Sequence, residues 1–160
     1  MSIREVCRED GGADRLALLS IIEKSENLTA EERDCAVELL DIYLGKPEGG
    51  DYLFIAASVS GVPVAYLCYG KTPLTDAVYD IYWILVHPDY RRKGVGTVLL
   101  DHTEGILRGL GARVIVAETS GLEGYEPARR FYVDNGFSEE ARIRCFYKPG
   151  DDLVVFVKRL

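Results

Sequence analysis

One segment, Tyr79–Leu100, constrains the fold more than any other part of this sequence. It starts with an apolar run from Ile81 to Val86 and turns at His87-Pro88-Asp89. Three basic residues and a Gly-Val-Gly step then lead into an amphipathic run. A short, continuous apolar run is typical of a strand covered on both faces, and the proline after it indicates a turn. The segment therefore predicts a buried strand, a tight turn and a helix, in that order.

The turn between this strand and this helix has the composition of an anion-binding site. The first amides of a helix lack acceptors within the helix and lie at the positive end of its dipole, so they bind anions. Gly94 and Gly96 let the backbone approach the anion, and Arg91, Arg92 and Lys93 add positive charge. We therefore expect a pyrophosphate to bind at this turn.

Other interpretations of the turn remain open. A basic turn can simply end a strand and aid solubility. A dinucleotide-binding turn requires G-x-G-x-x-G, but Leu99 occupies the position of the third glycine, although Glu118 lies near the spacing of a ribose-binding acid. A P-loop requires G-x-x-x-x-G-K-S/T, which this turn does not contain.

Length and charge limit the classes of function. The 160 residues are 48% hydrophobic and 28% charged, which predicts one soluble globular domain over residues 1–160. A formal net charge of −7 argues against a nucleic-acid partner. No apolar run approaches the roughly 20 residues of a membrane span and no signal-peptide core is present, so we expect a cytoplasmic protein without a membrane partner. The four cysteines form no C-x-x-C pair, so we expect no metal site, and Cys35 and Cys68 are expected to be buried.

The rest of the chain predicts further strands around the central segment. These are expected over residues 51–59, 62–69, 113–118, 140–147 and 153–157. Thr29 and Glu32 fit a capping box that opens a helix, and Pro127 is expected to begin a short helix that stops at Asn135-Gly136. The apolar strand 113–118 follows the helix that the central strand feeds. A strand, a helix and a second apolar strand predict a crossover between parallel strands, with a cleft at their carboxyl ends.

A second motif lies downstream, where residues 128–137 read ARRFYVDNGF. The pattern A-x-x-F-Y-x-x-x-G-F, together with R-x-x-G-x-G at Arg91, Gly94 and Gly96, resembles the two signatures of the GNAT superfamily of N-acetyltransferases. The two motifs span Tyr79 to about Phe137. The resemblance implies an α/β (α+β) fold with a mixed, largely antiparallel sheet, a central parallel strand pair forming a V-shaped cleft, and helices on both faces.

The resemblance also implies acetyl-CoA as co-substrate, without a metal. In that family the turn after the central strand holds the CoA pyrophosphate. Tyr125 occupies a position where the family pattern has an asparagine that contacts the pantetheine arm. The implied cofactor-binding residues are Leu85, Val86, Arg91, Arg92, Lys93, Gly94, Val95, Gly96, Thr97 and Tyr125.

Amide formation from a thioester requires a polarised carbonyl, a neutral amine and a proton for the leaving thiolate. By resemblance, a backbone amide at the end of the central strand polarises the carbonyl. Tyr132 protonates the sulfur, because a phenol with a pKa of about 10 suits a thiolate. Glu118 is our candidate for the general base because it closes its strand beside the cleft, with Asp80 and Tyr82 as alternates.

The leading hypothesis is an acetyl-CoA-dependent N-acetyltransferase that acts on a primary amine of a small molecule or peptide. Direct transfer in a ternary complex is expected, because no Cys-His or Ser-His pairing indicates an acyl-enzyme. The resemblance places Tyr43 beside the acceptor and allows a homodimer. The alternatives are a non-catalytic acyl-CoA-binding regulatory module and a nucleotide-dependent oxidoreductase. Four free carboxylates would suit a cationic amine: Asp151, Asp152, Glu123 and Glu126.

Overall fold

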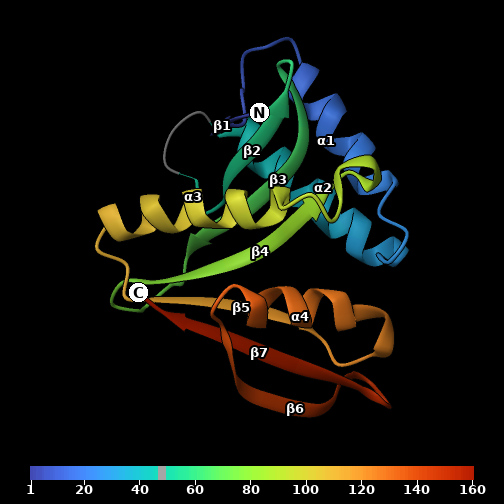
Figure 1. The fold of residues 1–160 in the computed structure, drawn as a ribbon, viewed down its shortest axis with the longest axis vertical. Coiled ribbons are helices and arrows are strands. Elements are labelled where there is room, and N and C mark those ends of the chain that lie inside the picture. The colour runs from blue at the N-terminus through green and yellow to red at the C-terminus, as the bar shows by residue number, and fades with distance from the viewer. Residues whose placement is uncertain (47–49) are drawn as a thin grey trace.

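The computed structural model of this protein describes residues 1–46 and 50–160, which form a seven-stranded sheet and four α-helices (Figure 1). The strands are β1 (Ser2–Glu5), β2 (Leu53–Val59), β3 (Val62–Lys71), β4 (Val78–Val86), β5 (Val114–Ser120), β6 (Ser138–Lys148) and β7 (Asp151–Arg159). The helices are α1 (Ala13–Glu23), α2 (Ala30–Gly45), α3 (Val95–Gly109) and α4 (Glu126–Asp134). Two short 3₁₀ turns, η1 (Pro88–Tyr90) and η2 (Glu123–Tyr125), precede α3 and α4.

The strands lie in the order β1-β2-β3-β4-β5-β7-β6. Every neighbouring pair is antiparallel except β4 and β5, which run parallel and are joined through α3. A parallel pair cannot be joined by a tight turn and needs a crossover connection, which α3 supplies. The sequence prediction of a mixed, largely antiparallel sheet with a central parallel pair is confirmed.

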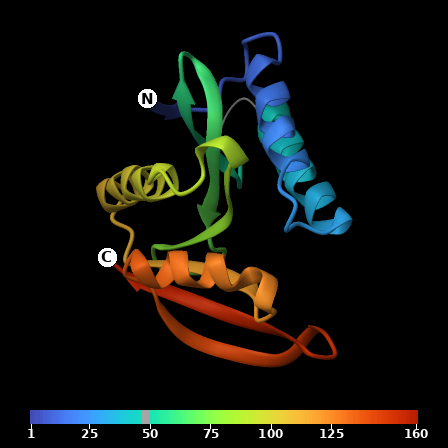
Figure 2. The same cartoon turned by 45° about the vertical axis from the view of Figure 1, so that its right-hand side comes forward.

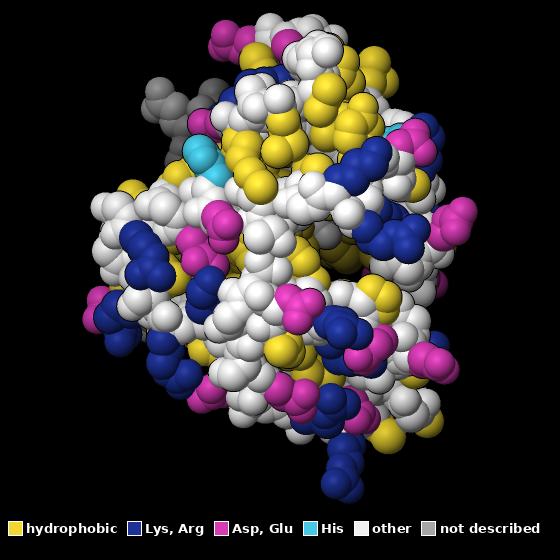
Figure 3. Space-filling view, viewed as in Figure 1, with side chains coloured by type: hydrophobic (Ala, Val, Ile, Leu, Met, Phe, Trp, Pro, Cys, Tyr) yellow, Lys and Arg dark blue, Asp and Glu magenta, His cyan; other side chains and the backbone are white. Residues whose placement is uncertain are grey.

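The central strands β4 and β5 pair only over their first halves. The paired residues are Val78–Ile81 of β4 and Val114–Ala117 of β5. In β4, a bulge at Tyr82, between Ile81 and Trp83, interrupts the pairing with β3. A bulge bends a strand and increases its twist. Beyond it the two strands part in a V (Figure 1), and the space-filling view has a hollow in this region, near the start of α3 (Figure 3). We call this V-shaped opening the cleft.

Helices cover both faces of the sheet. Figure 2 shows α1 and α2 on one side and α3 on the other. The α1–α2 side encloses a core that includes Leu18, Ile22, Leu40, Phe54 and Tyr66. On the opposite face, buried residues of α3 and α4 join one core with the sheet, including Leu99, Leu107, Tyr132, Ile115 and Phe156. The cleft therefore opens between two packed layers.

The expected capping box is present at the start of α2. Thr29 Oγ1 accepts a hydrogen bond from the Glu32 amide at 3.1 Å, and the Glu32 carboxylate accepts one from the Thr29 amide at 2.8 Å. Two of the amides that a helix start leaves without partners are thereby satisfied. The position of Glu32 is fixed by local sequence.

Two predictions about burial differ from the structure. Only Ile81 and Leu85 of β4 are buried, because the strand loses its neighbour where β5 departs and one edge faces the cleft. Cys68 is buried as predicted, but Cys35 lies on the exposed face of α2. Within the described residues, no helix is both long enough and apolar enough to span a membrane.

Candidate active site

The turn between β4 and α3 brings consecutive backbone amides to the open end of the cleft. Two of its residues have left-handed backbone conformations, Arg92 with φ of 57° and Gly94 with φ of 76°. Glycine adopts this conformation at little cost, whereas arginine adopts it rarely. Turns that alternate in this way direct successive N–H groups into an anion-binding concavity. The amides of Val95 and the next two residues begin α3 and extend that concavity.

The basic side chains of this turn are exposed, and two of them contact the turn itself. Arg91 Nε donates to the carbonyl of Val86 at 3.1 Å, and Lys93 Nζ donates to that of Asp89 at 2.7 Å. Figure 3 shows Lys and Arg side chains beside a hollow with apolar side chains at its base, near the start of α3. The local charge is positive although the chain is acidic overall.

Gly96 is required by packing as well as by any ligand. A Cβ atom on Gly96 would lie 3.2 Å from Cε2 of Phe131 and 3.7 Å from Cγ2 of Val86. The ring of Phe131, from α4, therefore rests on the first turn of α3, and the side chain of Val86 at the end of β4 lies close to the same glycine. The two sequence motifs meet at this contact.

The edge of β4 beside the cleft carries backbone groups that β5 does not use. Pairing with β5 ends at Ile81. The His87 amide donates to the Val64 carbonyl of β3 at 2.8 Å, and successive residues of a strand direct their backbone groups to opposite sides. Leu85 therefore directs its backbone groups toward β3, whereas Val86 directs its amide toward the gap, next to the anion-binding turn.

Tyr132 lies on α4 in an aromatic cluster on the α3–α4 face. Its ring stacks on Phe156 at 5.6 Å between centroids and contacts Phe137 edge-on at 5.3 Å. The residue is 6% exposed. Burial raises the pKa of the Tyr132 hydroxyl, so it keeps its proton at neutral pH. The hydroxyl is therefore protonated and able to donate, but it is a weaker acid than a phenol in water.

Glu118 lies near the carboxyl end of β5, on the opposite face of the sheet. Its neighbour Ala117 is buried against α3, and alternate residues of a strand point to opposite faces. Burial by its surroundings and then the charge of Asp80 raise the pKa of the Glu118 carboxyl, although the side chain remains open to solvent. Asp80 itself accepts a hydrogen bond from Thr72 Oγ1 at 2.6 Å. The two catalytic candidates therefore belong to opposite faces of the sheet, Tyr132 in the core with α3 and α4 and Glu118 on the other face.

The loop after β5 is held by Arg129 of α4. Its Nη1 donates to the carbonyls of Ser120 and Leu122, both at 2.7 Å. Its Nη2 pairs with Glu126 at 2.8 Å, so Glu126 is not the free carboxylate that the sequence suggested. Arg129, between Ala128 and Phe131 of the second motif, thus orders the loop that leads to Tyr125.

Tyr125 forms a hydrogen bond that the sequence did not predict. Its hydroxyl donates to the carboxylate of Glu32, at 2.9 Å from Oε1 and 2.7 Å from Oε2. Glu32 was recognisable as a helix-capping residue, but nothing in its local sequence links it to a tyrosine 93 positions away.

Two of the remaining predicted acceptor carboxylates are also engaged. Asp151 is buried and accepts a hydrogen bond from Ser120 Oγ at 2.5 Å. Asp152 accepts one from the amide of Cys145 at 2.9 Å. These groups hold the β6–β7 hairpin against the loop after β5. Glu123 is exposed in η2.

Tyr43, expected beside the acceptor, lies in the core instead. It is 1% exposed, and its hydroxyl donates to the carbonyl of Val6 at 2.7 Å and to Glu5 Oε1 at 2.9 Å. The helical stripe that carries Tyr43 faces the sheet, so its side chain ties α2 to the chain that follows β1.

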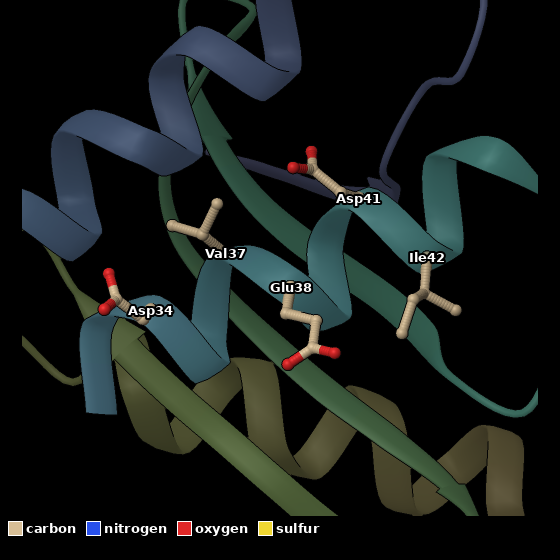
Figure 4. A pocket seen from close by; sticks show the side chains of 5 residues that line it. All are labelled: Asp34, Val37, Glu38, Asp41 and Ile42. Atoms are coloured by element: carbon tan, nitrogen blue, oxygen red, sulfur yellow. The ribbon is translucent and has the colours of Figure 1, made fainter. Parts of the chain in front are cut away.

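A shallow hollow lies on the outer face of α2, lined by Asp34, Val37, Glu38, Asp41 and Ile42 (Figure 4). Its lining residues come from α2 alone and include none of the cleft residues named above. Among residues 1–46 and 50–160, no group of three or more His, Cys, Asp or Glu side chains is placed to hold a metal ion.

Comparison with known proteins matches residues 7–137 to the acetyltransferase (GNAT) family. A curated relative, the aminoglycoside N(6')-acetyltransferase type 1 of Klebsiella aerogenes, is 30% identical over 104 residues. The match covers 64% of this chain and 62% of that protein, so the chain spans about three fifths of the relative's length.

Solved structures share the fold over nearly the whole chain. A protein from Desulfovibrio desulfuricans assigned to the GNAT acetyltransferases has a TM-score of 0.91 at 37% identity, covering 99% of this chain and 98% of that chain. The PaiA N-acetyltransferase of Thermoplasma acidophilum, solved with coenzyme A, has a TM-score of 0.76 at 18% identity, covering 99% and 98%. The ribosomal-protein-S18-alanine N-acetyltransferase of Escherichia coli has a TM-score of 0.75 at 20% identity, covering 99% and 92%.

Proposed function

This chain belongs to the acetyltransferase (GNAT) family, and we propose that it transfers an acetyl group from acetyl-CoA to a primary amine. The observation that carries the proposal is the turn between β4 and α3. Its left-handed residues Arg92 and Gly94, its free helix-start amides and its exposed basic side chains form an anion cradle at the mouth of the cleft. A CoA pyrophosphate has the charge and size that this cradle fits.

The main chain of the cleft would position the co-substrate. Residues 91–97 would bind the pyrophosphate, and the end of β4 at Leu85 and Val86 would hold the pantetheine arm. Acetyl-CoA supplies the acetyl thioester when bound. An amide at that edge would donate to the thioester oxygen, where negative charge develops, and such preorganised donors stabilise that charge strongly.

Two side chains would move protons. Glu118 would accept a proton from the ammonium of the acceptor, directly or through a water. Its raised pKa lies closer to the pKa of the ammonium, which makes it a stronger base than an ordinary carboxylate. Tyr132 would donate its phenolic proton to the departing thiolate, since burial keeps that hydroxyl protonated. Their positions on opposite faces of the sheet match direct transfer in a ternary complex.

The acceptor class is inferred from charge. Glu118 and Asp80 lie at the acceptor side of the gap, and the chain is acidic overall, so a cationic amine of a small molecule or peptide is favoured. The name of the Klebsiella aerogenes relative, an aminoglycoside acetyltransferase, agrees with a cationic acceptor.

A non-catalytic acyl-CoA-binding module is the second candidate, since it would use the same cradle. The two candidates differ in the products they form: only the enzyme releases free CoA thiol when amines are added. Family membership leaves the oxidoreductase alternative without support.

The test is a thermal-shift titration with acetyl-CoA, CoA and NAD, followed by thiol-release assays on a panel of amines. A ligand at 100 times its Kd adds about 2.7 kcal/mol of stability, which raises the Tm of a domain of this size by about 5–10 °C. We expect this shift with both CoA species and not with NAD.

Arginine variants test the cradle directly. Arg91→Ala and Arg92→Ala are expected to raise the Kd for CoA about tenfold each, the factor for one hydrogen bond to a charged group. Arg108→Ala, at the far end of α3, is the matched control and should bind CoA normally. Unchanged affinity in both cradle variants would show that CoA is held elsewhere.

A further inference from the structure

The hydrogen bond between Tyr125 and Glu32 joins two parts of the molecule that face each other across the cleft. Glu32 lies in the first turn of α2, whose buried residues pack on β2 and β3. Tyr125 ends η2 and caps the start of α4, beyond the carboxyl end of β5. Because β4 and β5 part at their carboxyl ends, the contact spans the cleft at its open end.

The contact is well defined at both of its ends. Both oxygens of Glu32 lie within 2.9 Å of the Tyr125 hydroxyl, and the Thr29 amide holds the same carboxylate at 2.8 Å. On the other side, the Tyr125 amide donates to the carbonyl of Leu122 at 3.0 Å. Arg129 binds the same Leu122 carbonyl, so the segment that presents Tyr125 is ordered.

The space beside this contact is the acceptor side of the cleft. Burial, then the charges of Glu118, Asp151 and Glu32, raise the pKa of the Tyr147 hydroxyl, so these three carboxylates lie around one tyrosine. The carboxylates come from β5, β7 and α2. The Tyr125–Glu32 contact therefore lies on the same acidic side of the molecule as Glu118.

We propose that the Tyr125–Glu32 hydrogen bond limits the width of the acceptor entrance and makes Tyr125 a specificity-determining residue. A slender primary amine passes beside the closed contact, whereas a bulky amine reaches Glu118 only after the contact breaks. The inference rests on the proposed acetyl transfer, because it assigns a role in that reaction. A hydrogen bond to a carboxylate is stronger than one between neutral groups, so breaking it penalises bulky acceptors selectively.

Tyr125→Phe is the informative variant because it removes only the hydroxyl and keeps the ring. Because Tyr125 is also a predicted co-substrate contact, the readout is the ratio of kcat/KM for a branched, multi-ring amine to kcat/KM for an unbranched alkylamine, in which any change in co-substrate binding cancels. This ratio should rise about tenfold, which corresponds to one hydrogen bond to a charged group. An unchanged ratio between the two acceptors would overturn the proposal.

Two variants of α2 distinguish the effect of the Tyr125–Glu32 hydrogen bond from the effect of negative charge on this helix. Glu31→Gln removes one negative charge from the same helix turn without touching Tyr125, and should leave the ratio unchanged. Glu32→Gln keeps an oxygen that accepts from Tyr125, and should retain much of the selectivity. If Glu31→Gln changes the ratio as much as Tyr125→Phe does, then charge rather than the contact controls selectivity, and the proposal is wrong.

Hydrogen–deuterium exchange tests the contact independently of turnover. Tyr125→Phe should increase amide exchange over residues 29–33, on the far side of the cleft, as well as over residues 121–126. Increased exchange at 121–126 alone would overturn the contact as a link across the cleft. Absence of thiol release by the unchanged protein with every amine would instead overturn the proposed function, while the acetyl-CoA thermal shift reports whether the cradle still binds.

Discussion

At the scale of single residues, the candidate base is defined by its surroundings more than by its identity. Glu118 stands near the end of a strand, where exposed carboxylates are common. In the structure, however, burial and the nearby charge of Asp80 both disfavour its ionised form. Thr72 Oγ1 donates a 2.6 Å hydrogen bond to the Asp80 carboxylate, which fixes the position of that group. The pair is therefore arranged so that one acid perturbs the other.

This arrangement predicts a specific pH dependence. Glu118 must be deprotonated to accept a proton, so kcat/KM should fall about tenfold per pH unit below its raised pKa. Asp80→Asn removes one cause of the raised pKa, so the acid limb should move to lower pH. The measurement is the pH profile of kcat/KM for both proteins with a single amine.

The control is Glu118→Gln, which should lower kcat/KM by about 10²–10⁴ at neutral pH, the usual contribution of a general base. An acid limb that stays at the same pH in Asp80→Asn would show that Asp80 does not act on the base.

At the scale of elements, α3 begins at a turn under two separate constraints. Gly94 has a left-handed backbone, and Gly96 supports the ring of Phe131 from α4. The first constraint concerns the shape of the anion cradle, and the second concerns the packing of one motif on the other. Glycines that look alike in sequence are therefore needed for different physical reasons.

Alanine substitutions in α3 should separate packing from helix propensity. In Gly96→Ala the new Cβ would lie 3.2 Å from Phe131, so the ring must move, and we expect the free energy of unfolding to fall by about 1 kcal/mol. Gly105→Ala, at an exposed position of the same helix with open space around the Cβ, should raise it by about 0.5–1 kcal/mol. Urea unfolding of both variants provides the check, and shifts of the same sign would contradict this account.

At the scale of the whole molecule, a buried ion pair connects the two sides of the divided sheet. Lys158 Nζ of β7 lies 2.5 Å from Glu104 Oε1 of α3 and donates to the carbonyl of Asn135, at the end of α4, at 2.8 Å. The Glu104 side chain is only 9% exposed. Since β4 and β5 share few paired residues, this bridge contributes to holding the halves at a fixed angle.

Lys158→Met should therefore destabilise the protein by about 3 kcal/mol, because it leaves the Glu104 carboxylate buried without a partner. The double variant Lys158→Met/Glu104→Met should recover most of that loss. Arg159→Met, which breaks the exposed pair with Glu140, is the matched control and should change stability by about 0.5 kcal/mol or less. Urea unfolding of the three variants measures these changes in the free energy of unfolding. Equal losses of stability in Lys158→Met and Arg159→Met would rule out a special role for the Lys158–Glu104 ion pair.

The sequence determined the features that depend on neighbouring residues. The apolar run and the basic glycine-containing turn predicted β4, the cradle and α3, and the motif at residues 128–137 predicted α4. Thr29 and Glu32 predicted the start of α2 through local hydrogen bonding. These patterns work because backbone conformation, strand and helix periodicity and helix capping are decided over a few residues.

Only the tertiary structure decided which distant groups meet. The left-handed conformation of Arg92, the early parting of β4 from β5 and the burial of Tyr43 have no local signal that sequence reasoning detected. The contact between Tyr125 and Glu32 joins residues 93 positions apart and exists only because the sheet divides beneath it. Packing of the layers sets such distances, and packing depends on every element at once. The residues of the candidate site could therefore be proposed from sequence, whereas the shape of its entrance could not.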